Sequence, residues 1–474
     1  MALPLSTLRG RFRGELGDSA AERARASADA SFVLGRAEAV AWPNDVDDVV
    51  TLVLWAREHR VPLTARGGGT SLDGESVPLH GGVVVDFARW TDVAPVDPVV
   101  GTVRVGPGVV NRALHDQLTP SGRFFPPNPG SWRSCSIGGN LATNASGPRS
   151  FRYGSTRRWV HSADVVLGTG ERVTLGPSTA KRSLGPDLLD LVVGSEGTLG
   201  LVTSVTLRLA TLPARRTGVV VPVGAIEPLA PLVVDLASRP SLRISAVEYV
   251  DARVAEALRQ RPGARLPGTG PLVLLEVESD GEESEGRALE ELDATLRKLA
   301  VSEPASVVAD ADRLWTLRGE AGAILDGASG RRIREDIAVP VRLVDRLLSD
   351  LRRISVDFGV ELYVYGHLGQ GNLHPNVVVD PESPKGTAVR RAIYDVAASL
   401  GGTVSGEHGV GSRKREFVPR ELGPVGVRLL RGWKSLCDPD GILNPGKLLP
   451  DLGPATPSLG PSPSAGAVAR TPPE

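Results

Sequence analysis

Two glycine-punctuated segments near the C-terminal end gather histidine and carboxylate side chains. The first, YGHLGQGNLHPNVVV, contains His367 and His374, and the second, SGEHGVG, contains Glu407 and His408. Only seven histidines occur in 474 residues, so three of them in two turns favour a site over separate structural histidines. A metal site, an acid–base pair and packing are the three roles to be weighed. Two histidines with one carboxylate form a ligand set for Zn, Mn or Fe(II) that leaves coordination positions open.

The flanking sequence predicts the elements that position these residues. VELYVYGH and NLHPNVVVD are typical of two strands of a hairpin, which would set His367 and His374 across from one another at the turn. TAVRRAIYDVAASLG carries apolar residues at helical spacing, among them Val389, Ile393 and Val396. This amphipathic helix would return the chain to SGEHGVG.

Composition excludes several classes of function. With 54 Lys and Arg against 55 Asp and Glu, no global field attracts nucleic acid or an anionic membrane. The two cysteines, Cys135 and Cys437, form neither a disulfide framework nor a CxxC pair, which indicates a reducing cytoplasm and excludes an iron–sulfur cluster within this chain. No stretch approaches a transmembrane segment. We therefore expect a cytoplasmic protein that binds its partners at local sites.

The chain is long enough for two domains of mixed α and β structure. PNDVDDVVTLVLWAREHR predicts a helix, with Asn44 and the following acids at its N-terminus. The strand VPLTA and two β-rich runs follow, and strand–helix–strand units with an open sheet resume from about residue 217. The predicted organisation is an N-terminal arm (1–26), a first domain (27–213), a second domain (214–450) and a disordered tail (451–474).

Glycine-rich loops mark the first domain. RGGGTS alone is a weak signal, because a tight surface turn explains it equally well. PPNPGSWRSCSIGGNLATNASGPRSFRYG and GSEGTLG add two further backbone-rich loops. Residues 119–159 also show little periodicity, which predicts an ordered loop that wraps a ligand. Three such loops fit an extended cofactor with a pyrophosphate.

The order of six motifs, from RGGGTS through GHLGQGNLH and SGEHGVG to DPDGILNPGKLL, resembles the FAD-linked oxidase family with a vanillyl-alcohol-oxidase (PCMH-type) flavin domain. Within that family the chain is most similar to D-2-hydroxyacid (D-lactate) dehydrogenases and the FAD subunit of glycolate oxidase. The resemblance extends from about Ser27 to Leu449. It implies an α+β protein in which a PCMH-type FAD-binding domain precedes an FAD-linked oxidase C-terminal substrate domain.

The resemblance also implies a flavin site. FAD would be non-covalent, because Thr70 follows Gly69 where members with covalent flavin carry His or Cys. Residues 66–71 and 127–144 would wrap the pyrophosphate and ribityl chain, while Cys135 would only pack. Glu196, Gly197 and Gly200 would line the adenine or isoalloxazine side, and Asn444 would close over the flavin. The full set implied is Arg66, Gly67, Gly68, Gly69, Thr70, Ser71, Pro127, Gly130, Ser131, Ile137, Gly138, Gly139, Asn140, Asn144, Gly147, Tyr153, Gly154, Glu196, Gly197, Gly200, Val202 and Asn444.

For the reaction, the resemblance implies that His367, His374 and Glu407 hold a divalent metal (Zn, Mn or Fe) and that His408 is the general base. A 2-hydroxy acid can chelate such a metal, and the metal would lower the pKa of the substrate's hydroxyl group. Histidine, with an ordinary pKa of ~6.5, is suited to removing that proton. The resemblance further implies that Arg318 binds the substrate carboxylate. Arg334 falls where some relatives place a Lys for a second carboxylate.

Three departures from the family pattern concern metal identity and substrate size: Gln370 and Asn128 stand where Asp is common, and Gly322 stands where some relatives have Thr. The predicted function is oxidation of a D-2-hydroxy acid (D-lactate, glycolate or D-2-hydroxyglutarate) to the 2-oxo acid. The alternatives are an alcohol oxidase or an alkyl-glycerone-phosphate-synthase-like enzyme of the same fold, and a non-catalytic FAD-binding subunit. The four site residues count against the last.

The predicted reaction needs an external electron acceptor. A quinone, a cytochrome, electron-transfer flavoprotein or a separate iron–sulfur subunit would each serve, and such a partner could hold the protein at the inner membrane. No nucleic-acid partner is expected. The sequence leaves the oligomeric state open, a homodimer included.

Overall fold

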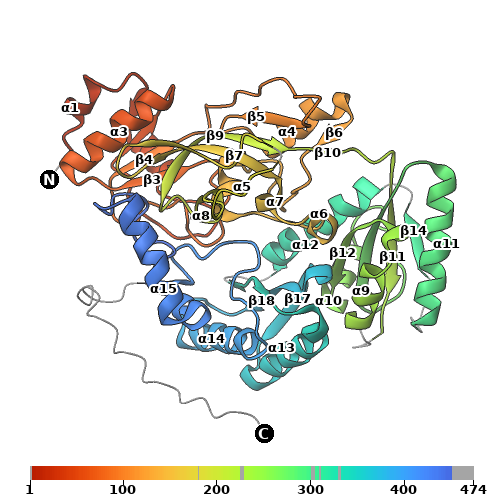
Figure 1. Cartoon of the computed structure of the whole chain (residues 1–474). Helices are drawn as coiled ribbons and strands as arrows, with labels where there is room; N and C mark the ends of the chain where they lie inside the picture. The colour runs from red at the N-terminus through yellow and green to blue at the C-terminus, as the bar shows by residue number, and fades with distance from the viewer. Residues whose placement is uncertain are drawn as a thin grey trace, which may run out of the picture.

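The computed structural model describes residues 3–179, 181–224, 229–299, 305–308, 311–328 and 332–450. The predicted tail, 451–474, lies outside them. In Figure 1 a first domain, red to yellow, lies above a second domain, green to blue, which carries the large sheet. Among the described residues no helix combines the length and the apolar character that crossing a bilayer requires.

Two four-stranded sheets form the first domain. In one sheet the strands β2, β4 and β3 are parallel and β1 is antiparallel. The other sheet is antiparallel throughout. The short strands β10 and β6 form a separate antiparallel pair. The sheets comprise, in order, β1 (Glu15–Gly17), β2 (Ala39–Trp42), β4 (Val83–Asp86) and β3 (Leu63–Arg66), then β5 (Thr102–Val105), β9 (Gly200–Arg208), β7 (Val160–Leu167) and β8 (Arg172–Leu175), with β10 (Ala210–Thr211) and β6 (Arg123–Phe124) apart.

The predicted helix of this domain is confirmed as α3 (Val46–His59). Its N-cap is Asp45, whose side chain accepts the N–H of Asp48, and not Asn44. Part of the predicted arm packs on the same core: β1 pairs with β2, and Leu8 and Phe12 are buried. The arm also forms α1 (Leu5–Arg9) and α2 (Ala20–Ala26).

The aperiodic segment 119–159 is ordered and contains several short helices. The many glycine and polar residues of this segment leave no apolar periodicity from which these helices could be predicted. The helix α5 begins where the Ser136 hydroxyl accepts the N–H of Gly139. The helices of this part of the chain are α4 (Asn111–Leu118), η1 (Thr119–Ser121), α5 (Ile137–Thr143), α6 (Ser150–Tyr153), α7 (Thr156–Trp159) and, later, α8 (Leu189–Val192).

The second domain is built on an eight-stranded sheet in the order β14-β11-β13-β12-β17-β18-β15, with β16 also on β18. The predicted strand–helix units are confirmed, apart from residues 226–228 of the first predicted helix, which lie outside the described residues. The strands are β11 (Arg215–Pro222), β12 (Ile244–Val250), β13 (Leu272–Ser279), β14 (Ser306–Val308), β15 (Ile333–Arg334), β16 (Ile337–Ala338), β17 (Glu361–His367) and β18 (Asn372–Val378).

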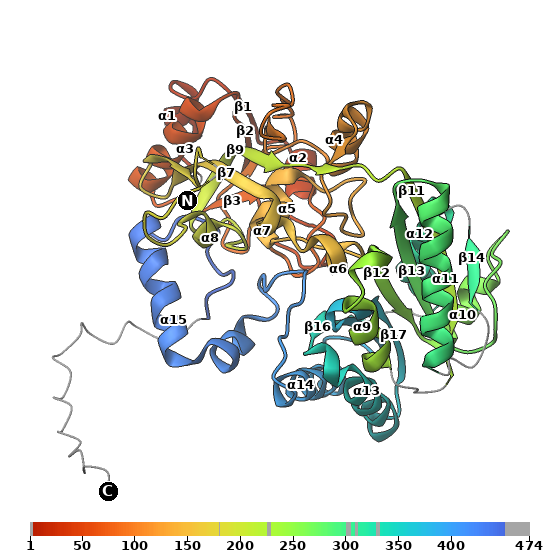
Figure 2. The same cartoon turned by 45° about the vertical axis from the view of Figure 1, so that its right-hand side comes forward.

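Helices cover both faces of this sheet. On one face, alternate strand residues such as Val247, Val364 and Leu373 pack under α9, α11, α13 and α14 (Figure 2). On the other, α10 and α12 cover the β11–β12–β13 end. The helices are α9 (Leu229–Ala237), η2 (Pro240–Leu242), α10 (Ala252–Arg259), α11 (Glu282–Lys298), α12 (Ala311–Ala328), η3 (Val341–Leu343), α13 (Val344–Phe358), η4 (Leu368–Gln370), α14 (Pro384–Ser399), η5 (Arg415–Phe417) and α15 (Val418–Cys437).

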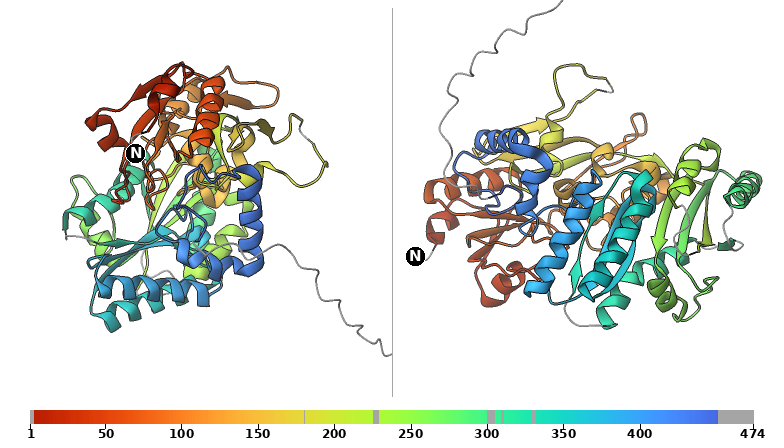
Figure 3. Two further views of the ribbon diagram at one scale, coloured as in Figure 1. Left: turned by 90° about the vertical axis from the view of Figure 1, so that its left-hand side faces the viewer. Right: turned by 90° about the horizontal axis from the view of Figure 1, so that it is seen from below.

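After α15 the chain returns to the first domain, as the side view in Figure 3 shows. The N–H of Leu63 bonds to Ile442, and the N–H of Asn444 bonds back to Leu63, so residues 442–444 run beside β3. Lys434 of α15 donates to the carbonyl of Thr198. The N- and C-terminal parts of the sequence therefore meet next to the Gly194–Gly200 turn.

Candidate active site

The hairpin β17–β18 places both predicted histidines on one face of the sheet. His367 lies opposite Asn372 and His374 opposite Tyr365, so the two histidines are two pairs apart along the ladder, with ring centroids 5.2 Å apart. Since side chains alternate across a strand, both rings point away from the Val364–Leu373 face and towards the first domain. The predicted hairpin is confirmed, and its histidines converge.

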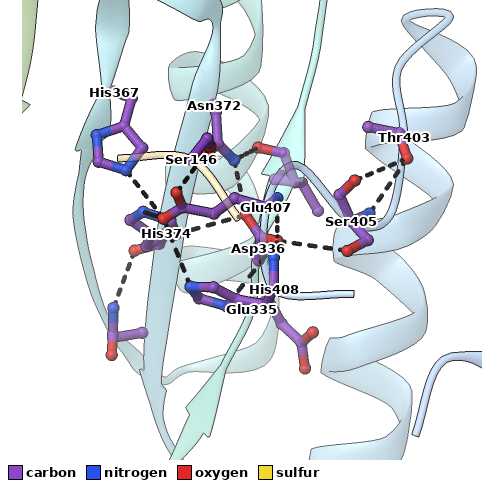
Figure 4. A network of polar contacts seen from close by, with 12 residues as sticks. Ser146, Glu335, Asp336, His367, Asn372, His374, Thr403, Ser405, Glu407 and His408 are labelled. Atoms are coloured by element: carbon purple, nitrogen blue, oxygen red, sulfur yellow. Dashed lines mark hydrogen bonds and ion pairs between the residues drawn. The ribbon is translucent and has the colours of Figure 1, made fainter. Parts of the chain in front are cut away.

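Glu407 lies between the two histidines (Figure 4). Its Oε1 is 2.9 Å from His367 Nε2 and 3.4 Å from His374 Nε2. Its Oε2 accepts a 3.0 Å hydrogen bond from the hydroxyl of Ser146, which belongs to the first domain. The ligand atoms of His367, His374 and Glu407 all lie within 4.8 Å of one another, which suits a single metal ion.

His408 lies beside this group. Its ring stacks on that of His374, with centroids 5.1 Å apart and planes 6° from parallel, and its Nε2 is 3.6 Å from Glu407. Its side chain is 22% exposed, against 6% for His367 and 8% for His374. The structure thus brings together the four residues of the two motifs, and it leaves His408 the most accessible.

Sequence reasoning missed Glu248, which orients His367. Its Oε1 is 2.6 Å from His367 Nδ1, and its Oε2 is 2.6 Å from Arg318 Nη2. Glu248 is the one charged residue of strand β12, which pairs with β17. A carboxylate behind a metal-binding histidine is a common supporting arrangement.

Asp336 is a second missed residue, and it shapes the turn that carries Glu407. Its Oδ2 accepts the N–H groups of Glu407 and His408, each at 2.8 Å, and its Oδ1 accepts from Asn372 at 2.7 Å. Asp336, His374 and His408 also have ligand atoms close enough for a metal. Because the oxygens of Asp336 are already engaged, the geometry favours His367, His374 and Glu407 as the ligand set.

Burial and charge set the protonation of these groups. Burial lowers the pKa of His374, which favours a neutral imidazole. Burial acts in the same direction on His367, but Glu248 and Glu407 outweigh it and raise its pKa to about 10. Burial would raise the pKa of Glu407, yet His367 and His374 hold it well below its ordinary value. Glu248 and Glu407 therefore place negative charge on both sides of His367, which would also favour a bound cation.

One cavity of about 630 Å³ joins this cluster to the glycine loops of the first domain. The side-chain Nδ2 of Asn140 lines it and is buried with no partner among the described residues, as expected of a donor aimed at a ligand. Cys135 also lines it, and burial raises the pKa of its thiol to about 11. The predicted residues in the lining are Arg66, Gly67, Gly68, Gly69, Thr70, Ser71, Gly130, Ser131, Gly138, Gly139, Asn140, Glu196, Gly197, Gly200, Val202, Arg318, Arg334, His367, His374, Glu407 and His408.

Seven residues predicted to contact the cofactor lie outside that lining: Pro127, Ile137, Asn144, Gly147, Tyr153, Gly154 and Asn444. Ile137 is in the core, and Asn144 ends α5 in the left-handed conformation. The buried Asn444 donates from Nδ2 to the carbonyls of Glu75 and Glu196. These contacts support the cavity wall, and direct cofactor contact at these positions stays a prediction.

Three arginines of the second domain, Arg318, Arg332 and Arg334, also line the cavity. The guanidinium of Arg318 lies over the Tyr365 ring at the cavity wall. Its Nε and Nη2 contact Glu248, whose negative charge partly offsets that of the arginine. Arg334 also lines the cavity, together with Arg332, which sequence reasoning missed and which donates to the carbonyl of Gly322. An anionic ligand fits beside these arginines.

A buried ion pair and a hydrogen bond join the two domains beside the cavity. Arg149, before α6, donates to both oxygens of Glu276 in β13, at 2.8 and 3.2 Å. The hydroxyl of Tyr153 donates to Glu278 at 2.6 Å. Burial would raise the pKa of Glu276, but Arg149 outweighs it and lowers the pKa to about 2. The SGPRSFRYG segment thus binds the second domain.

Comparison with known proteins assigns the family. Residues 37–176 match the model of an FAD binding domain, and residues 212–448 match that of the C-terminal domain of FAD linked oxidases. The chain belongs to the FAD-linked oxidase family and is a flavin-dependent oxidoreductase.

Several relatives align over most of the chain. The chain is 32% identical to the glycolate oxidase subunit GlcD of Bacillus subtilis, over 87% of this chain and 88% of that protein. It is 34% identical to a D-lactate dehydrogenase of Archaeoglobus fulgidus (86% and 91%) and 30% identical to a D-2-hydroxyglutarate dehydrogenase of Stutzerimonas stutzeri (86% and 90%).

Solved structures share the fold at lower identity. p-Cresol methylhydroxylase matches with a TM-score of 0.77 at 16% identity, covering 94% of this chain and 96% of that one. Alkyldihydroxyacetonephosphate synthase matches with a TM-score of 0.72 at 18% identity, covering 93% and 84%. The predicted architecture, a flavin domain followed by an oxidase C-terminal domain, is confirmed.

Proposed function

We propose that the protein oxidises a D-2-hydroxy acid to the 2-oxo acid. The observation that carries the proposal is the single cavity that runs from the glycine loops at Gly67–Ser71 and Gly138–Asn140 to the cluster of His367, His374, Glu407 and His408. Relatives named for D-lactate, D-2-hydroxyglutarate and glycolate support this substrate class.

The ligand set proposed for a divalent metal is His367, His374 and Glu407. When bound there, the metal would supply a Lewis acid for the hydroxyl and carboxylate oxygens of the substrate. Glu248 holds the His367 ring so that Nε2 faces Glu407, and Ser146 fixes the other Glu407 oxygen. Non-covalent FAD would supply the acceptor for the hydride from C2.

His408 is the proposed general base. It lines the cavity, is the most exposed of the three histidines, and has its backbone N–H fixed by Asp336. Its imidazole takes the hydroxyl proton as the hydride leaves C2. Arg318, Arg332 and Arg334 supply positive charge for the substrate carboxylate, with Arg318 oriented by Glu248 and Tyr365.

Turnover would require an external acceptor for the electrons: a quinone, a cytochrome, electron-transfer flavoprotein or a separate iron–sulfur subunit. The name of the Bacillus subtilis relative, an oxidase subunit, supports a protein partner. A cytoplasmic location, with attachment to the inner membrane through that partner, is part of the proposal, and so is the option of a homodimer.

Anaerobic mixing tests the substrate. The purified flavoprotein is exposed separately to D-lactate, L-lactate, glycolate and D-2-hydroxyglutarate, and both flavin bleaching and the 2-oxo product are measured. Bleaching by one D-acid or by glycolate, with stoichiometric product, is expected. A flavin that none of these acids reduces would overturn the proposal.

A further inference from the structure

The turn Ser405–Gly411 carries Glu407 and His408, yet it belongs to no helix or strand. Its backbone is therefore fixed from outside. From the second domain, Asp336 accepts the N–H groups of Glu407 and His408. Two further N–H groups of the turn point to the first domain.

Glu196 of the first domain accepts those two groups. Its Oε1 is 2.6 Å from the N of Val410, and its Oε2 is 2.9 Å from the N of Gly411. Glu196 is itself held in place: its φ is +54°, and Asn444 donates to its carbonyl. Its side chain is thus directed at the His408 turn, although sequence reasoning placed it against the adenine or isoalloxazine.

A second buried carboxyl group, Glu75, lies beside Glu196. A Cβ added to Gly409 would meet Glu75 Oε1 at 2.6 Å and Glu196 Oε1 at 3.0 Å, so the two carboxyl groups lie close together against the same side of this glycine. Glu75 Oε1 is buried and has no hydrogen-bond partner among the described residues. Nearby, Lys414 pairs with Asp73 at 2.9 Å.

Two adjacent buried carboxyl groups cannot both be charged at low cost. Burial raises the pKa of Glu75 well above its ordinary value, and the charges of Glu196 and Asp73 add to the effect. Burial also raises the pKa of Glu196, to about 7, while the N–H groups of Val410 and Gly411 oppose it. Glu75 is then the neutral acid, and Glu196 is the carboxylate that accepts from the backbone.

We propose that Glu196 is a positioning residue: it ties the turn bearing Glu407 and His408 to the cavity-lining turn Gly194–Gly200. This inference rests on the proposed function of Glu407 and His408. Because one carboxylate joins the flavin-side turn to the turn that carries Glu407, losing that carboxylate is expected to disturb the metal site from a distance.

Three variants of the holoenzyme test the role. Glu196→Gln keeps the shape of the side chain but places an amide NH₂ against a backbone N–H. Glu196→Asp keeps the negative charge on a side chain that is one methylene shorter. In Glu75→Gln the neutral amide has nearly the same shape as a protonated glutamic acid, so this variant should change the site little. The matched control is Glu421→Gln, because Glu421 also accepts backbone N–H from this segment, at Val404, but is exposed and does not touch the turn.

The readouts are the limiting rate of anaerobic flavin reduction, the substrate concentration at half saturation, and zinc affinity by competition with a fluorescent chelator. For Glu196→Gln we expect the limiting rate and the zinc affinity each to fall about 10- to 100-fold, with half saturation changed by less than about threefold. Glu196→Asp should recover part of both losses. Glu75→Gln should lose less than Glu196→Gln, and the control should match the wild type.

A wild-type rate and zinc affinity in Glu196→Gln would overturn the proposal, as would a greater loss in Glu75→Gln. If Glu196→Gln does not retain FAD, the test is made with Glu196→Asp. An unchanged zinc affinity in Glu196→Asp would contradict the positioning role of Glu196. A wild-type protein that binds zinc but is reduced by no 2-hydroxy acid would instead contradict the proposed function, and the zinc affinities of the variants would still test Glu196.

Discussion

His408 combines exposure to the cavity with a fixed backbone, as a proton acceptor requires. We expect His408→Ala to slow flavin reduction by the substrate about 10²- to 10⁴-fold, the range typical of losing a general base. Zinc affinity should stay close to wild type, since His408 is not in the favoured ligand set. Stopped-flow absorbance and a zinc competition assay measure the two quantities. Loss of zinc affinity would make His408 a ligand.

Glu248 acts on the metal site through His367. We expect Glu248→Gln to lower zinc affinity about 10- to 100-fold, because it weakens the partner that orients the ligand ring. Glu361→Gln is the matched control, since Glu361 lies at the exposed start of β17, the strand that ends at His367. Equal zinc affinities in the two variants would contradict the orienting role.

At the residue scale, the two motifs already indicated His367, His374, Glu407 and His408. Glu248 and Asp336 were not predictable, because their roles depend on strand neighbours distant in sequence. β12 comes to lie beside β17 only in the folded sheet, and Asp336 reaches the Glu407 turn through a bridge to Ser405. The alternation of Glu276 and Glu278 in LVLLEVES was a readable signal of a polar face, which the structure directs at Arg149.

At the scale of elements, α6 and β13 are joined by the pair Arg149–Glu276. We expect Arg149→Met to destabilise the protein by about 3–5 kcal/mol, because it leaves Glu276 buried without its main partner. Urea unfolding at neutral pH measures the loss. The control Arg287→Met removes an exposed partner of Glu283 and should cost less than about 1 kcal/mol. Equal midpoints for the two variants would contradict the account.

The same pair predicts a pH dependence. The pKa of Glu276, about 2 in the folded protein, lies below the ordinary 4.5, so the pair stabilises the fold above pH 4.5, and this contribution is lost as the pH falls from 4.5 towards 2. The difference in unfolding midpoint between wild type and Arg149→Met should therefore narrow from about pH 5 towards pH 3. A difference that widens over that range would contradict the assigned charge state.

The elements themselves were largely predictable, because α3, the β17–β18 hairpin and α14 carry clear periodicity. The segment 119–159 was read as an ordered loop, and its short helices were missed. α5 begins Ile-Gly-Gly-Asn, where low helix propensity is offset by the Ser136 cap and by packing of Ile137 and Leu141.

At the scale of the whole molecule, neither domain contains a complete site. The first domain contributes the glycine loops, Ser146 and Glu196, and the second contributes the histidines and Glu407. Residues 442–444, from the end of the described chain, then pack beside β3 and hold the Glu196 turn through Asn444. This arrangement follows from long-range pairing, which local sequence patterns do not encode.

The most direct test of metal-assisted oxidation in one shared cavity is the rate of anaerobic flavin bleaching before and after removal of metal. The holoenzyme, saturated with the hydroxy acid that reduces it, is treated with a chelator, freed of it, and then supplied with zinc or manganese. If a metal assists the oxidation, bleaching is lost on chelation while the flavin stays bound, and one of the metals restores it. Bleaching that proceeds at the original rate in metal-free protein would contradict metal assistance.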